Sequence, residues 1–124
     1  MDQQKAEASP FEVNYIDLAQ RDWVKWFAQA VLHQKQLTDW KIKFLDFNDG
    51  SRCNNEFKHI EISGLGDQPW YYLKEIILHE IAHALASDQN YKKTSATSHD
   101  IPFFKRYGEL LIEFSQYEPR IYEV

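Results

Sequence analysis

Cysteine and methionine are almost absent from this chain of 124 residues, which has one of each, Cys53 and Met1. A single cysteine excludes an intrachain disulfide framework and any zinc site built from several cysteines. Glycine and proline are also scarce, with four of each. By contrast, hydrophobic residues make up 44% of the chain and aromatic residues 15%. At this length, the composition predicts one domain with a substantial core.

Basic residues are fewer than acidic ones: the chain has 14 Lys and Arg and 19 Asp and Glu, which gives a formal net charge of −5. This balance provides no attraction for phosphate backbones or anionic lipids, so we expect no strong nucleic-acid or membrane binding. No apolar run is long enough to span a membrane, and the N-terminus lacks the apolar core of a signal peptide. We therefore expect a cytoplasmic protein, with a flexible lead-in over residues 1–12 and a single domain over residues 13–124.

The first half of the chain predicts one helix and two strands. Residues 17–36 carry apolar side chains at helical spacing, among them Trp23 and Phe27. Residues 40–44 and 58–63 alternate apolar and polar side chains, which is typical of half-buried strands. The N-terminal part of the domain is therefore expected to be a helix followed by a small sheet.

The second half predicts two more helices. Residues 70–87 are apolar almost all round, which indicates a helix in the interior of the domain. The polar residues 88–98 predict a loop, after which Asp100 and Pro102 provide an N-cap and an early helical proline for a last helix. The predicted fold class is therefore α+β, with a buried central helix and a C-terminal helix.

The central helix contains the segment 79–83, which reads His-Glu-Ile-Ala-His. Residues four apart project from the same face of a helix, so His79 and His83 can bind one metal ion. Glu80 lies about 100° round the helix, beside such a metal. A carboxylate in that position can accept a proton from a water molecule whose pKa the metal lowers. The segment therefore predicts a zinc-dependent hydrolase with Glu80 as general base.

A catalytic zinc takes three protein ligands, so a third must come from elsewhere in the chain. His99 is the preferred candidate, because it follows a loop long enough to return the chain to the central helix. Glu109 and Glu113 are the alternatives if a carboxylate of the last helix serves instead. A third histidine six residues after His83 is excluded, because that position is Gln89. The lone methionine also excludes a metzincin, which requires a Met-turn.

With these residues in view, the sequence resembles the SprT-like (Spartan-type) metallopeptidases. The matching segments are residues 78–85 and 99–104, which read Leu-His-Glu-Ile-Ala-His-Ala-Leu and His-Asp-Ile-Pro-Phe-Phe. The resemblance implies a zincin-like minimal catalytic domain with His79, His83 and His99 as zinc ligands and Glu80 as general base. It also implies an open edge strand near Ile60 along which an extended peptide substrate could lie.

Two departures from this family limit what the resemblance implies. The family often has glycine after its third histidine, whereas this chain has Asp100, which could orient a ligand instead. Many members add a cysteine-rich zinc ribbon or DNA-binding regions, and a chain with one cysteine and an acidic balance shows no sign of either. The resemblance therefore implies a protein or peptide substrate, and a role in cleaving DNA-bound proteins cannot be carried over from the family to this chain.

Two other readings of the metal site stay open. In a non-catalytic zinc-binding interaction module, the metal would have four protein ligands, and Asp88, Asp100, Glu109 or Glu113 would be the fourth. In a zinc hydrolase of another kind, the substrate would not be a peptide.

For a few further residues, the sequence gives weaker evidence of a role in the site. His59 could border the cleft, although a packed or surface histidine is the simpler interpretation. Tyr91 and Arg106 could stabilise an oxyanion. Cys53 is expected to have a structural role.

Overall fold

The computed structural model describes residues 19–47, 49–89 and 99–119. Their elements follow in the order α1 (Ala19–Gln34), β1 (Lys41–Leu45), β2 (Arg52–Asn54), β3 (His59–Ser63), α2 (Trp70–Gln89) and α3 (Ile101–Glu113). The described part of the protein is therefore α+β, as predicted, and consists of three helices and one three-stranded mixed sheet. The predicted lead-in over residues 1–12 lies outside the described residues. No helix among the described residues is long and apolar enough to cross a membrane.

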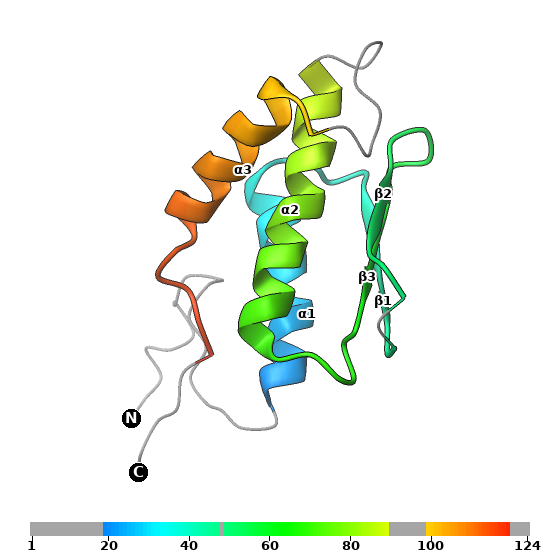
Figure 1. Ribbon diagram of the computed structural model, residues 1–124, viewed down its shortest axis with the longest axis vertical. Helices are drawn as coiled ribbons and strands as arrows, with labels where there is room; N and C mark the ends of the chain where they lie inside the picture. Colours follow the sequence, from blue (N-terminus) through cyan, green and yellow to red (C-terminus); the bar gives the residue numbers. More distant parts are fainter. Residues whose placement is uncertain (1–18, 48, 90–98, 120–124) are drawn as a thin grey trace.

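Helix α2 occupies the centre of this arrangement, with α3 on one side and the sheet on the other, and α1 packs against it as well (Figure 1). This position explains why most residues of the helix are apolar, because α1, α3 and the sheet cover most of its surface. Tyr71, Tyr72 and Glu75 in its first turns are exposed. The helix runs to Gln89, two residues beyond the predicted end at residue 87. The remainder of the predicted loop, residues 90–98, lies outside the described residues.

The sheet has the strand order β1-β3-β2, in which β3 pairs in parallel with β1 and antiparallel with β2. Strand β3 is therefore the central strand, and the prediction of an open edge near Ile60 is wrong. The prediction failed because it missed β2, whose three residues are too few to show an alternating pattern. Among the described strands, β1 and β2 form the two edges of the sheet.

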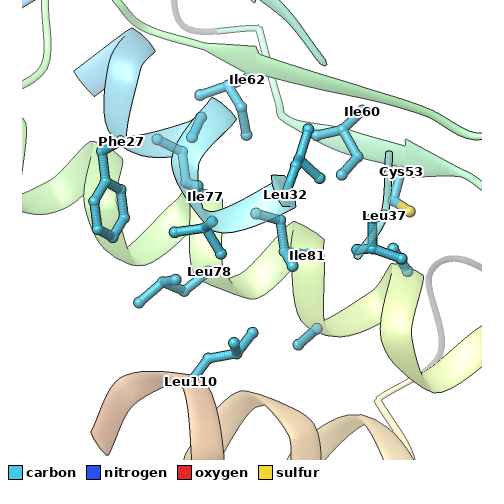
Figure 2. Packing of buried hydrophobic residues seen from close by; sticks show 14 of the residues in the cluster. Phe27, Leu32, Leu37, Cys53, Ile60, Ile62, Ile77, Leu78, Ile81 and Leu110 are labelled. Carbon is cyan, nitrogen blue, oxygen red and sulfur yellow. The ribbon is translucent and has the colours of Figure 1, made fainter. Parts of the chain in front are cut away.

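The core fills the space between the sheet and helices α1 and α2, and it continues between α2 and α3 (Figure 2). Ile60 and Ile62 of β3 are fully buried on the inner face of the sheet, where Ile77 and Ile81 of α2 meet them. Leu110 points from α3 towards the other side of α2. Because α2 is enclosed on both sides, polar residues at its buried positions must find partners within the protein.

The turn after β3 carries the chain into α2. Gly64 has a φ of +94°, and its N–H donates a hydrogen bond to the carbonyl oxygen of Leu45 at 3.0 Å. A Cβ atom at this glycine would lie 2.7 Å from Cγ of Gln68. Both the backbone conformation and the close approach therefore favour glycine at this turn.

Candidate metal centre

His79 and His83 lie one turn apart on α2, and their ring centroids are 5.0 Å apart. Their common face follows from the helical spacing of four residues, as the sequence predicted. His83 is buried, with 3% of its surface exposed, whereas His79 is half-buried. The two imidazoles therefore form a pair that reaches from the interior of the protein towards solvent.

His99 completes a three-histidine group from the segment just before α3. Its ring centroid lies 5.1 Å from those of both His79 and His83. One ring nitrogen from each of the three residues lies within 4.8 Å of the others. The structure thus brings together the three histidines that the sequence predicted as ligands, and they lie close enough to bind one metal ion.

Two observations test whether these histidines fit a metal ion. The Nε2 atoms of His79 and His99 are 3.3 Å apart. This equals the separation of about 3.3–3.4 Å that a tetrahedral ion imposes on nitrogens about 2.0–2.1 Å from it. In addition, Nδ1 of His83 is buried and has no hydrogen-bond partner. A bound cation or a donor would relieve this unsatisfied atom, so the donor set fits a metal of the zinc type.

Both histidines of α2 are held in the neutral form. Burial, with the charges of His79 and His99 as further causes, lowers the pKa of His83 to about 4. Burial and the neighbouring His99 also lower the pKa of His79 below its ordinary value. Both rings are therefore unprotonated at pH 7, which is the state in which imidazole donates a lone pair to a metal.

Glu80 lies on the same helix but is not part of the three-histidine group. Only 7% of its surface is exposed, and burial raises the pKa of its carboxyl to about 7. It lies near β2, because its charge contributes to raising the pKa of the Cys53 thiol, after burial as the main cause. The carboxyl therefore lies between the metal-binding face of α2 and an edge strand of the sheet, and it titrates near neutral pH.

The carboxylates proposed as alternative ligands are engaged elsewhere. Asp100 caps α3, as predicted, because its Oδ1 accepts a hydrogen bond from the backbone N–H of Phe103 at 3.2 Å. Glu109 contacts Arg106 at 3.3 Å, and Glu113 forms an ion pair with Lys35, the residue that follows α1. None of these carboxylates belongs to the three-histidine group.

The remaining sequence-based candidates stay outside the group or outside the described structure. His59 lies on β3 next to Lys41 of β1 in the strand register and is not part of the three-histidine group. The side chain of Asp88 and all of Tyr91 lie outside the described residues. The role of Arg106 at an oxyanion stays a prediction.

Phe103 is a residue of this site that sequence reasoning did not single out. It is 1% exposed, and its ring lies 4.9 Å from His79, 4.3 Å from His83 and 4.8 Å from His99 between centroids. The Asp100 cap fixes its position, because the first turn of α3 begins there. The sequence shows that Phe103 follows His99 by four residues, at the start of the predicted last helix. Its contact with all three imidazole rings, however, depends on how α3 packs against α2.

We expect Phe103→Leu to lower the affinity for zinc about tenfold or more, because residues that orient metal ligands are commonly worth 10–100-fold. The matched control is Phe114→Leu, since Phe114, the C-cap residue of α3, is also 1% exposed but contacts Phe27 rather than the histidines. Competition with a chelating dye measures both affinities. Equal losses in the two variants would show that Phe103 acts only through general stability.

Comparison of this chain with known protein families, with curated proteins and with solved structures gave no match.

Proposed function

We propose that this chain is a zinc-dependent metallopeptidase of the SprT-like type, with a zincin-like catalytic domain. The observation that carries the proposal is the group formed by His79, His83 and His99, whose ligand nitrogens lie within 4.8 Å of one another. Metal-assisted hydrolysis also needs a base near the metal, and Glu80 supplies a buried carboxyl next to His79 in the sequence. Three imidazoles and an adjacent carboxyl are the parts that metal-assisted hydrolysis needs.

A zinc ion held by the three imidazoles would supply a Lewis acid that lowers the pKa of water and polarises a carbonyl group. Glu80 would accept a proton from the attacking water and pass it to the departing amine. In the metal-free protein burial raises the pKa of Glu80 to about 7, and the charge of a nearby zinc ion would lower this pKa and favour the carboxylate form that accepts a proton. Phe103 would restrict the orientation of the imidazoles, because its ring packs against all three of them.

A peptide substrate is supported by the position of β2. This strand pairs with β3 on one side and forms an edge of the described sheet on the other. Its central residue, Cys53, faces the core close to Glu80. An extended peptide that pairs with the outer edge of β2 would therefore pass beside the proposed general base. β2 thus replaces the strand near Ile60 as the proposed peptide-binding edge.

A closed structural zinc site has less support. Such a site would need a fourth protein ligand. The three-histidine group includes no carboxylate among the described residues, and its member His99 is exposed to solvent. This arrangement favours a metal with one coordination position available to water or substrate.

The proposal is tested by metal content and hydrolysis together. We expect one zinc per chain after purification without chelators, and cleavage of an unstructured protein such as casein. Cleavage should stop when a chelator removes the metal and return when zinc is added. Zinc with four protein ligands and no hydrolysis would instead indicate an interaction module. Cleavage of small esters or amides without any peptide cleavage would indicate a different hydrolase.

A further inference from the structure

Two large apolar side chains are exposed beside the three-histidine group. They are Ile101, with 83% of its surface exposed, and Phe104, with 59% exposed; we call this pair the apolar rim. The ring of Phe104 lies 6.3 Å from that of His99 and 5.2 Å from that of Phe103, between centroids. The apolar rim therefore adjoins the most exposed of the three histidines.

Packing of the core does not account for the apolar rim. Helix α3 buries Phe103 and Leu110, which lie on the side that faces α2. Ile101 and Phe104 are three residues apart on the solvent side of the first turn, and the contact of Phe104 with the core is the edge contact of its ring with Phe103. A single exposed apolar residue such as Ile112 is ordinary on a protein surface, whereas apolar side chains at the edge of a ligand site are in a position to contact the ligand.

We propose that the apolar rim contacts a large apolar side chain of the substrate next to the cleaved bond. The protein would then prefer aliphatic or aromatic residues at that substrate position. This inference rests on the proposed peptidase function and names the substrate class of the same site. Two side chains offer too little area for a stable interface with a folded partner. They are large enough to cover one side chain of a peptide whose backbone lies at the metal site.

The first test compares peptides that differ only in the residues flanking the cleaved bond. We expect the zinc-loaded protein to cleave Leu or Phe peptides with a kcat/KM about tenfold above that for the matched Ala peptide. In Phe104→Ser this ratio should fall towards one, mainly through a higher KM for the apolar peptides. Phe104→Leu should retain most of the preference, because it keeps an apolar surface.

Ile112→Ser is the matched control, since Ile112 is also an exposed apolar residue of α3, with 78% of its surface exposed. It lies eight residues beyond Phe104, which is about 12 Å along the helix, and it should leave the ratio unchanged. Retention of the full preference in Phe104→Ser, or equal losses in the two serine variants, would overturn the inference.

The second test measures binding rather than turnover. Glu80→Gln should bind the Leu peptide about tenfold more tightly than the Ala peptide by calorimetry, and addition of Phe104→Ser should remove this difference. If the wild-type protein cleaves peptides without preferring apolar residues, the inference fails and the proposed function stands. If the zinc-loaded wild-type protein cleaves none of the peptides, the proposed function fails, and this inference fails with it.

Discussion

Replacing Glu80 with glutamine is expected to lower the rate of peptide hydrolysis by about 10²–10⁴-fold while one zinc per chain is retained. Glutamine has nearly the same shape as glutamate, but it cannot accept the proton of the attacking water. The histidine group does not include Glu80, so the metal ligands stay in place. Steady-state hydrolysis of a fluorogenic peptide, together with elemental analysis of the variant, measures both quantities.

The control for this variant is Glu118→Gln, which makes the same change at an exposed position beyond the C-terminal end of α3 and outside the three-histidine group. Hydrolysis by this control should stay close to that of the wild-type protein. Hydrolysis by Glu80→Gln at the wild-type rate would show that Glu80 is not the general base. Loss of zinc from Glu80→Gln would instead show that the carboxyl supports the metal site directly.

The same variant has a second expected effect, on the stability of the metal-free protein. Burial raises the pKa of Glu80 from its ordinary value of 4.5 to about 7, so the folded state binds a proton more tightly than the unfolded state. The stability that this proton contributes is fully present below pH 4.5 and is lost as the pH rises through about 7. Metal-free Glu80→Gln should therefore exceed the wild-type protein in free energy of unfolding by up to about 3 kcal/mol at pH 8.

Urea unfolding of both proteins in the presence of a chelator measures this difference. It should disappear near pH 4, where Glu80 is protonated in the folded and unfolded states alike. The depressed pKa values of His79 and His83 affect both proteins in the same way and cancel in the difference. A difference that does not change with pH would show that Glu80 is not responsible for it.

Replacing His99 with alanine is expected to weaken zinc binding about a hundredfold. Structural zinc sites bind with about 10–16 kcal/mol over four ligands, or about 3 kcal/mol for each ligand, and 1.4 kcal/mol corresponds to a factor of ten. His99 is exposed, so its removal leaves no cavity in the core. Competition with a chelating dye at fixed pH measures the affinity, and thermal unfolding with a chelator checks that the fold is intact.

His59→Ala is the control for this loss, because His59 is a histidine of the sheet that lies outside the metal-binding group. Its zinc affinity should match that of the wild-type protein. Unchanged zinc affinity in His99→Ala would show that the metal is held by other residues, and the proposed site would then be wrong.

The sequence by itself was sufficient for features that depend on local spacing. The interval of four residues between His79 and His83 places both on one face of any helix, and the apolar surroundings of the segment place that helix inside the domain. The sequence also predicted Asp100 as the N-cap of α3, because an N-cap depends on the residue type and on the three residues that follow. For the same reason, the predicted strands at residues 40–44 and 58–63 correspond to β1 and β3 within one residue.

Only the tertiary structure decided which elements lie side by side. Strand β3 was expected at an edge and lies at the centre, because β2 pairs with it across a hairpin that three residues could not reveal in the sequence. The position of His99 beside His79 also depended on packing, and the same packing brings Glu109 and Glu113 next to basic partners. The contact of Phe103 with all three imidazoles has the same origin. Strand order and contacts between distant residues depend on how whole elements pack, and the periodicity of one segment carries no information about its neighbours.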